Sequence, residues 1–245
     1  MLSKNQIKHI RSLQLKKNRV NESDFIVEGE KMINELLSSG MIIKRIFATK
    51  SWINLNVSKL NLIEHQVVSE KELTMISNLK NPNKVLALVK VDFPKFDYND
   101  LKGITLILDD IRDPGNLGTI IRLCDWFNVS NIICSNSSVD VFNSKVVQST
   151  MGSLFRVNIF YKDLINFFNE CPYDRTVYGA SLSGSDIKKI KIDKDMFLVV
   201  GNESNGISDS VKSFVDKKLK IKNINGGAES LNVACATSIL LYEFC

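Results

Sequence analysis

The sequence predicts an α/β protein in which strands and helices alternate along nearly the whole chain. Short apolar runs rich in Val, Ile and Phe are typical of buried strands. They are followed by segments with apolar residues at three- and four-residue spacing, which is typical of helices. This alternation favours a mainly parallel sheet covered by helices on both faces. A chain of 245 residues is long enough for two domains of modest size.

We expect a small α/β domain over residues 1–92, a linker over 93–102 and a second domain over 103–245. The linker has a proline, several Asp and Asn residues and no periodicity. In the first domain we expect helices at 1–20, 28–38 and 70–76, and strands at 25–28, 42–48, 66–68 and 85–91. In the second we expect strands at 104–108, 131–134, 156–160, 176–180, 196–200 and 218–221, and helices at 117–127, 144–151, 163–170, 209–215 and 231–244.

Composition limits the compartment and the chemistry. No apolar run reaches the roughly 18–20 residues of a membrane helix, and the basic N-terminus lacks the apolar core of a secretory signal. We therefore expect a cytoplasmic protein without membrane contacts. The five cysteines are scattered without a Cys-x-x-Cys pair, and there are two histidines. This pattern predicts neither disulfides nor a metal site.

Basic residues are concentrated in the first part of the chain. Residues 1–95 hold 16 of the 32 Lys and Arg but 9 of the 27 Asp and Glu. This excess predicts contact with a polyanion, although a solvated basic face would give the same count. The cations that we expect to face outward from the first helix and contact the phosphates of such a polyanion are Lys4, Lys8, Arg11, Lys16, Lys17 and Arg19.

The first polar segment, DPGNLGTIIR at 113–122, lies where a buried strand gives way to a helix. Asn116 is placed to cap that helix, and ligands of open α/β sheets bind at this end of the strands. Arg122 is flanked by apolar residues, so we expect its head group to be held near the sheet. A capping Asn with a surface Arg would leave the same pattern. The segment lacks the glycine fingerprint of dinucleotide-binding proteins and the Walker lysine.

The second polar segment, VVGNESNGIS at 199–208, also follows a buried strand. Gly201 and Gly206 permit close backbone approach or a positive φ, as a ligand-binding loop requires. Glu203 can accept hydrogen bonds from amides or from a substrate hydroxyl. A generic polar loop would explain this segment equally well by itself.

The third segment, ESLNVACATSILLYE at 229–243, opens the last helix. Ser230 is expected to cap it. Asn232 would then fall in the first turn, where its helix propensity costs several tenths of a kcal/mol, so we expect its amide to reach into a pocket. The joint occurrence of three such segments at strand–helix junctions predicts a ligand site built from all three.

The order Asn-x-Gly-x-x-x-Arg, Gly-Asn-Glu-x-x-Gly-Ile and Ser-Leu-Asn-Val resembles the three motifs of the SpoU (TrmH-type) RNA ribose methyltransferases of the SPOUT class. The resemblance covers residues 104–245 and implies a deep C-terminal trefoil knot, which is an exception to the usual rule against knots. It also implies S-adenosylmethionine as cofactor and a homodimer whose protomers complete each other's sites. Residues before the linker, including FIVEGEKMINELL at 25–37, resemble the substrate-binding domain often fused ahead of this domain.

The resemblance also implies the site residues. The polar residues around the reacting ribose would be Asn116, Arg122, Glu203, Ser230 and Asn232. The residues contacting or lying near the cofactor would be Ala180, Ser181, Val200, Gly201, Asn202, Gly206, Ile221 and Leu231. One departure concerns Ile221: many members have Ile-Pro-Met before the third motif, whereas residues 221–224 here are Ile-Lys-Asn-Ile.

The chemistry of a sulfonium methyl group limits what the enzyme has to do. Because this methyl is already a strong electrophile, the protein mainly positions and deprotonates the ribose 2′-hydroxyl. Arginine is normally protonated, so we predict that Arg122 stabilises the developing alkoxide or grips the adjacent phosphate. Glu203, Ser230 and Asn232 would orient Arg122 and the ribose.

The leading interpretation is thus an S-adenosylmethionine-dependent 2′-O-ribose methyltransferase acting on ribosomal or transfer RNA. A catalytically silent RNA-binding protein of the same fold and a base-modifying SPOUT methyltransferase are the alternatives. A nucleotide-binding oxidoreductase is disfavoured because its glycine fingerprint is missing.

Overall fold

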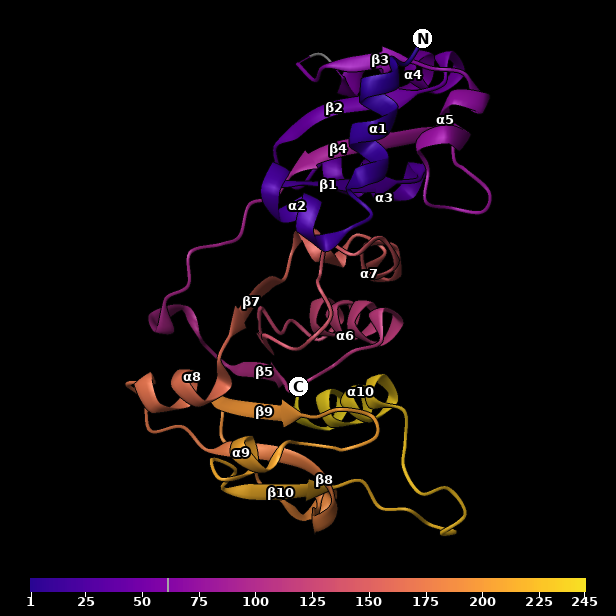
Figure 1. Cartoon of the computed structure of the whole chain (residues 1–245). Coiled ribbons are helices and arrows are strands. Elements are labelled where there is room, and N and C mark those ends of the chain that lie inside the picture. The colour runs from indigo at the N-terminus through magenta and orange to yellow at the C-terminus, as the bar shows by residue number, and fades with distance from the viewer. Residues whose placement is uncertain (61) are drawn as a thin grey trace. The chain divides into compact units, whose positions relative to one another are not determined.

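The computed structural model of the chain describes residues 1–60 and 62–245. It consists of two compact units (Figure 1). The N-terminal unit comprises Met1–Asp92 and Asp140–Phe155, and the C-terminal unit comprises Phe93–Val139 and Arg156–Cys245. Within the described residues, no helix combines the length and apolar character needed to cross a membrane.

A four-stranded sheet in the order β1-β4-β2-β3 forms the centre of the N-terminal unit. β4 pairs antiparallel with β1 and β2, whereas β3 pairs parallel with β2. The apolar faces of the helices pack on this sheet and bury side chains such as Ile10, Leu73 and Leu86. The strands are β1 (Asp24–Glu28), β2 (Ile43–Ala48), β3 (His65–Val67) and β4 (Val85–Lys90). The helices are α1 (Lys4–Ser12), α2 (Lys16–Glu22), α3 (Glu30–Leu37), α4 (Lys50–Asn56), α5 (Glu70–Ile76) and α7 (Ser144–Thr150).

The single helix predicted over the first twenty residues is wrong, because the chain forms α1 and α2 with a break between them. Side chains of α2 bind the free carbonyls at the end of α1. Asn18 Nδ2 donates to the Ser12 carbonyl at 2.8 Å, and Arg19 Nη1 donates to the Leu13 carbonyl at 2.7 Å. Leu15 falls in this break and is 65% exposed. α4 was not predicted.

The segment Asp140–Phe155 packs with the N-terminal unit although residues 103–245 were predicted to form one domain. Gln148 Nε2 donates to the backbone carbonyl of Glu28 at 2.9 Å, and the rings of Phe142 and Phe25 lie 4.5 Å apart. At Gly152, with φ of +101°, an added Cβ would lie 2.6 Å from Cγ of Glu35. The close fit at this glycine fixes the segment against α3.

Arg19 was predicted to contact RNA, but it is 5% exposed and serves the fold instead. Its Nε and Nη2 both donate to Oδ2 of Asp140, at 3.0 and 2.5 Å, while Nη1 bonds the carbonyls that end α1. A guanidinium with its donors bound inside the protein cannot reach a phosphate. The other five cations of that set are exposed: Lys4, Lys8, Arg11, Lys16 and Lys17.

A six-stranded sheet, parallel throughout, forms the C-terminal unit. The strands run in the order β10-β8-β9-β5-β6-β7 and confirm the predicted mainly parallel sheet. Their bounds are β5 (Ile104–Leu108), β6 (Asn131–Ser135), β7 (Asn158–Lys162), β8 (Val177–Asp186), β9 (Met196–Val200) and β10 (Lys217–Lys220). The helices are α6 (Pro114–Trp126), α8 (Leu164–Glu170), α9 (Asp209–Lys212) and α10 (Val233–Phe244).

The strand order reverses between β5 and β9. From β5 the chain moves outward through β6 to β7 and then returns to β8 on the other side. Right-handed connections therefore place α6 and α8 on opposite faces of the sheet. α8 and α9 pack on the face that carries Ile107, Phe197 and Val199, and α10 packs beside α6. Such a reversal opens a crevice beyond the carboxyl ends of the two central strands.

Removal of the Asp140 carboxylate should destabilise the protein, because Arg19 would remain buried without its counter-charge. We expect Asp140→Ala to lower the free energy of unfolding by about 3 kcal/mol. Urea unfolding followed by circular dichroism measures the loss. Lys16→Ala, which removes an exposed cation of α2, is the matched control and should cost less than about 0.5 kcal/mol. Equal losses in the two variants would show that the buried pair is unimportant.

Candidate active site

The strand reversal brings together the carboxyl ends of β5 and β9, the position at which open α/β sheets bind ligands. Leu108 and Val200 are the last residues of these strands and lie opposite each other in the parallel ladder. One more backbone bond, from Asp109 N to the Val200 carbonyl at 2.9 Å, continues the pairing past the strands. Beyond the strands, the segment after β5 leads to α6, and the segment after β9 forms the loop at residues 201–208. The first two polar segments are therefore brought side by side.

Three side chains, one from each polar segment, are joined by hydrogen bonds. Asn116 Nδ2 donates to Glu203 Oε1 at 2.7 Å, and Asn232 Nδ2 donates to Asn116 Oδ1 at 3.0 Å. Asn232 Oδ1 in turn accepts the backbone N–H groups of Ala234 and Cys235 at 2.9 and 3.3 Å. We refer to Glu203, Asn116 and Asn232 as the three-residue network.

The direction of these bonds is fixed from both ends. An ionised carboxylate accepts only, so Asn116 must turn its NH₂ group toward Glu203 and its oxygen toward Asn232. Backbone N–H groups donate only, so Asn232 must turn its oxygen toward α10 and its NH₂ group toward Asn116. The two requirements agree. The network therefore has one orientation, and it holds Glu203 beside α6 and α10.

The caps of α6 and α10 differ from the prediction. Asp113 caps α6 by accepting the Asn116 N–H at 2.8 Å, which leaves the Asn116 side chain free for the network. Pro114 follows at the first helical position, where its missing N–H costs nothing. Asn232 caps α10, so its amide orders the helix as well as the site. Ser230 lies before the helix, is exposed and makes no side-chain hydrogen bond with a described residue.

Arg122 is not held near the sheet. Its side chain lies on the exposed side of α6 and forms no hydrogen bond or ion pair within the described part of the chain. Trp126, one turn further along the same helix face, is 82% exposed. The prediction failed because the buried face of α6 is supplied by Leu117, Ile120, Ile121 and Cys124. Arg122 therefore does not join the three-residue network within this chain.

The loop at residues 201–208 is closed by its own backbone. Asn202 and Gly206 exchange two backbone hydrogen bonds, at 3.0 and 2.8 Å. Gly206 has the predicted positive φ, +67°. The close approach at Gly201 is to this loop rather than to a ligand, because an added Cβ would lie 2.2 Å from the Ile207 nitrogen. The exposed Glu203 is thus presented by a preformed turn.

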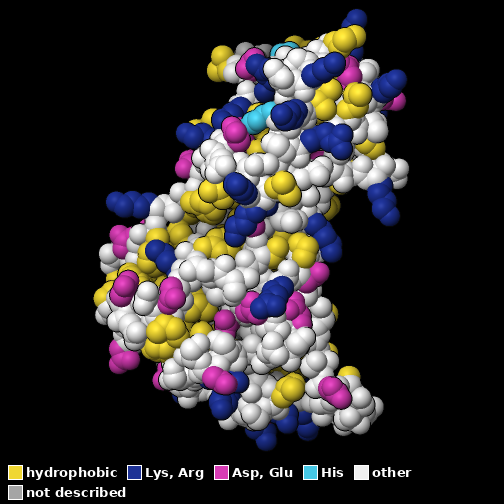
Figure 2. Space-filling view, viewed as in Figure 1, with side chains coloured by type: hydrophobic (Ala, Val, Ile, Leu, Met, Phe, Trp, Pro, Cys, Tyr) yellow, Lys and Arg dark blue, Asp and Glu magenta, His cyan; other side chains and the backbone are white. Residues whose placement is uncertain are grey.

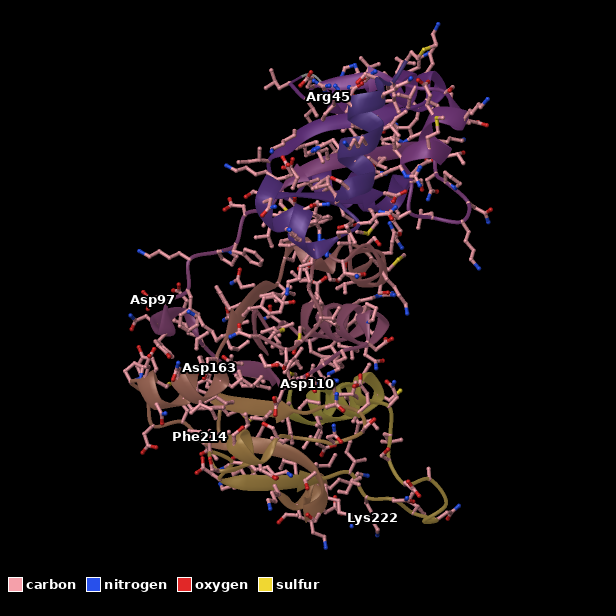
Figure 3. The ribbon with its side chains drawn as sticks, in the orientation of Figure 1. Arg45, Asp97, Asp110, Asp163, Phe214 and Lys222 are labelled. Atoms are coloured by element: carbon pink, nitrogen blue, oxygen red, sulfur yellow. The ribbon has the colours of Figure 1, made fainter. Side chains whose placement is uncertain are left out.

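Two aspartates that the sequence analysis missed anchor this loop to the end of β5. Asp109, 5% exposed, accepts the Ser208 N–H at 2.7 Å. The backbone carbonyl of Asp110 accepts a bond from Asn202 Nδ2 at 2.9 Å, and its carboxylate a longer one at 3.3 Å. Asp110 has a φ of +59° and lies at the end of the sheet nearest α10 (Figure 3). An acidic pair directly after a buried strand was the available signal.

The residues expected around the cofactor lie along the same edge of the sheet. Gly201 and Ile221 directly follow the carboxyl ends of β9 and β10, and Ala180, within β8, comes one residue after Gly179, which pairs with Val199 near the end of β9. Val200 and Gly201 are buried, and Ser181 is half-buried. Two apolar side chains are exposed beside these positions: Leu182 of β8 at 69% and Leu231, directly before the cap of α10, at 49%. Backbone polar groups beside exposed apolar side chains fit an adenosine-bearing ligand.

Within the described residues, no cluster of three or more His, Cys, Asp or Glu side chains could hold a metal ion. The cysteines are unpaired thiols. Burial raises the pKa of Cys124 and Cys134, that of Cys134 to about 12. These two thiols are therefore protonated at neutral pH and poor nucleophiles.

Comparison with known families matches residues 103–242 to the family described as SpoU rRNA Methylase. The chain belongs to the SpoU rRNA methylase family. Residues 4–87 of this SpoU protein match a second family, the MRM3-like substrate binding domain.

Relatives align with the SpoU chain over nearly its full length. The 23S rRNA (guanosine(2553)-2′-O)-methyltransferase RlmP of Bacillus subtilis is 30% identical, over 98% of this chain and 96% of the relative. A putative TrmH-family RNA methyltransferase from Porphyromonas gingivalis has 33% identity and a TM-score of 0.88, covering 100% of this chain and 98% of that one. The AdoMet-bound rRNA methyltransferase of Sinorhizobium meliloti has 30% identity and a TM-score of 0.88, covering 99% and 95%.

These similarities confirm the predicted family and α/β fold class. They also confirm the predicted enzyme: the chain is an RNA 2′-O-methyltransferase that uses S-adenosylmethionine.

Reversing the polarity of one bond in the network should impair methyl transfer. Asn116→Asp places a carboxylate against Glu203 and removes the donor. A hydrogen bond to a charged group contributes about 1.5–3 kcal/mol, which corresponds to a loss of about 10- to 100-fold in kcat/KM. Glu203→Gln in the same chain restores a donor facing the new carboxylate. We expect this double variant to recover at least part of the loss in a methyl-transfer assay, and no recovery would contradict the bond.

The anchoring role of Asp110 is tested with two substitutions that both tolerate its positive φ. Asp110→Asn keeps an oxygen acceptor and should retain kcat/KM within about threefold. Asp110→Gly removes the carboxylate that helps to hold Asn202, so the loop that presents Glu203 loosens. We expect it to lose about tenfold, corresponding to one hydrogen bond of about 1–1.5 kcal/mol. Similar kinetics for the two variants would contradict the anchor.

Proposed function

We propose that this enzyme methylates the ribose 2′-hydroxyl of a nucleotide in 23S ribosomal RNA, and that the three-residue network positions that ribose. One observation carries this proposal: the two side-chain hydrogen bonds of Asn116 join all three polar segments at one point. The end-to-end similarity to a 23S rRNA 2′-O-methyltransferase supports the class of RNA. A cytoplasmic location is part of the proposal, since ribosomal RNA is the substrate.

Glu203 is placed to orient the reacting hydroxyl. Its Oε1 is bound by Asn116, whereas Oε2 has no hydrogen-bond partner among the described residues. Oε2 can therefore accept the hydrogen bond of a ribose hydroxyl and point its oxygen lone pair at the donor methyl. S-adenosylmethionine, when bound, supplies that electrophilic methyl group. Positioning of this kind accounts for much of the acceleration of a bimolecular transfer.

The cofactor would be held by β8 together with the carboxyl ends of β9 and β10. Backbone groups at Ala180, Gly201 and Ile221 would bind its polar atoms, and Leu231 would cover its apolar surface. Val200, Asn202, Gly206 and Ser181 support these positions. The deep trefoil knot of the SpoU family belongs to this part of the proposal.

The RNA would also contact the exposed cations of α1 and α2. Lys4, Lys8, Arg11, Lys16 and Lys17 form no ion pair with a described residue. Such contacts fix orientation without reading sequence and make binding depend on salt. These cations, together with the match of residues 4–87 to a substrate binding domain, support RNA binding by the N-terminal unit.

Arg122 would complete the site of a second copy of the chain. Asn116 and Arg122 are six residues apart on α6, so they differ by about 9 Å along the helix and by more than a quarter turn around it. Arg122 shares its exposed helix face with Trp126, and the adjacent α10 exposes Ile239 and Tyr242 at 38% and 76%. Exposed aromatic residues beside an arginine are typical of protein interfaces. We propose a homodimer on this face, in which Arg122 stabilises the alkoxide or grips the phosphate at the partner's ribose.

The reaction is tested by transfer of labelled methyl from S-adenosylmethionine to deproteinised 23S, 16S and transfer RNA from a strain lacking the gene. A 2′-O-methyl group makes the adjacent phosphodiester resistant to alkali, so the product is an alkali-resistant labelled dinucleotide. We expect it in 23S RNA. Label confined to transfer RNA would change the substrate class, and label in a base would change the reaction.

Arg122→Lys keeps the positive charge and removes the paired N–H groups of the guanidinium, so it separates the contributions of the two. If two parallel N–H groups bind the phosphate or alkoxide, lysine cannot replace them. We expect Arg122→Lys and Arg122→Ala each to lower kcat by about 100-fold, as loss of an oxyanion donor does elsewhere. The dissociation constant of S-adenosylmethionine, measured by calorimetry, should stay unchanged. Near-normal activity of Arg122→Lys would contradict a role that depends on two parallel N–H groups of the guanidinium.

Mixed dimers test whether Arg122 acts across the interface. Arg122→Ala keeps the network, and Asn232→Ala keeps the arginine, so each homodimer should be nearly inactive. A heterodimer would contain one site with both parts intact and should regain activity. Trp126→Glu in both chains should yield monomers by analytical ultracentrifugation and abolish that recovery. Absence of recovery in purified heterodimers would place Arg122 in its own chain's site.

A further inference from the structure

Half of the basic residues of the C-terminal part of the chain are concentrated in two short segments. Residues 96–245 contain 16 Lys and Arg, and eight of them lie within residues 186–195 and 216–222. These eight are Lys188, Lys189, Lys191, Lys194, Lys217, Lys218, Lys220 and Lys222. Because residues 96–245 as a whole carry more acidic than basic residues, this concentration was hidden in the overall charge.

The two segments lie side by side in the structure. β8 pairs with β10 so that Ser185 is opposite Leu219 and Asp186 is opposite Lys220. The contact is close, since a Cβ added at Gly184 would lie 2.5 Å from the Lys218 carbonyl oxygen. Dark blue side chains gather over β8 and β10 at the bottom of the space-filling view (Figure 2). We call the eight lysines of these adjoining segments the basic edge.

The lysines of the basic edge are exposed and have no ion-pair partner, within 4.0 Å, among the described residues. The four aspartates of the same segments are engaged elsewhere. Asp195 accepts the Gly103 N–H at 2.6 Å, Asp216 the Val177 N–H at 2.8 Å, and Asp193 the Tyr178 hydroxyl at 2.9 Å. Asp186 accepts the backbone N–H of Lys188 at 3.1 Å. The acids thus support the fold. The Lys217 ammonium lies 5.3 Å from the centre of the Tyr178 ring, and the other seven ammonium groups remain available to an external anion.

The surface between the two segments is hollow. A cavity of 530 Å³ is lined by Gly184, Ser185, Ile190, Val215, Asp216, Lys217 and Lys218. The edge also continues toward the proposed active site, because Lys220 and Lys222 flank Ile221 beyond the end of β10. Figure 3 shows Lys222 where the chain leaves β10 for the loop that leads to α10. A polyanion bound here would pass close to the reacting ribose.

We propose that the basic edge binds the phosphate backbone of the RNA substrate and holds the strand that carries the target nucleotide. The inference rests on the proposed action on RNA and assigns phosphate contacts to the C-terminal unit itself. Lysines on an edge strand also prevent edge-to-edge pairing between sheets, which would account for Lys218 and Lys220. It does not account for Lys188, Lys189, Lys191 and Lys194, which lie outside β10.

The test is the salt dependence of RNA binding by the full chain. The edge variant carries Lys188→Ala, Lys189→Ala, Lys218→Ala and Lys220→Ala, and its matched control carries Arg at the same four positions. The probe is a deproteinised 23S RNA transcript, with dissociation constants measured between 50 and 200 mM KCl. Each lost phosphate contact lowers the slope of log K against log salt by about 0.7–0.9.

We expect the edge variant to lose about three units of slope and at least tenfold in RNA affinity at 50 mM KCl, with the arginine control unchanged. The affinity for S-adenosylmethionine should also be unchanged. An unaltered slope in the edge variant overturns the proposal. The proposal is also overturned if the edge variant binds RNA with normal affinity but self-associates. That result would show that the lysines serve to prevent edge-to-edge pairing of sheets. If the unmodified chain binds the RNA normally but does not methylate it, the proposed reaction is overturned. The salt dependence would then still support RNA binding by the basic edge.

Discussion

The amide of Asn116 connects the parts of the proposed active site, because it is bonded on one side to Glu203 and on the other to Asn232. These residues come from segments that are far apart in sequence and meet where the strand order reverses. An amide is suited to this position since it donates at one end and accepts at the other. Its orientation is imposed by the carboxylate and by the N-terminus of α10. The site and the last helix are therefore ordered by the same bonds.

Around this network, rigid backbone supports exposed functional groups. The loop that carries Glu203 is closed on itself and tied to β5 through Asp109 and Asp110, so ligand binding need not order it. Arg122, in contrast, lies on a surface with exposed aromatic residues and forms no hydrogen bond or ion pair with the residues that the structure describes. The position of this arginine outside the network is the reason for proposing that a second protomer completes the site.

Much of this arrangement could be predicted from sequence, since the strands and most helices have strong periodicity and the motifs fall at strand ends. The side-chain partners could not. Asp113 and Asn116 are both good caps, and only the fold decides that Asp113 caps α6. Arg19 has the sequence context of a surface cation, yet Asp140, 121 residues away, makes it a buried one. The basic edge was missed because its two segments adjoin only through the pairing of β8 with β10.

The central claim is that Glu203, Asn116 and Asn232 act as one unit, and a comparison of alanine variants tests it most directly. The three single variants, the three double variants and the triple variant would be measured for kcat of methyl transfer at saturating RNA and cofactor. Residues that act as a unit are not additive, so each single variant should lose nearly as much as the triple. Losses that multiply from single to double to triple would contradict the account, because they would show three independent contributions.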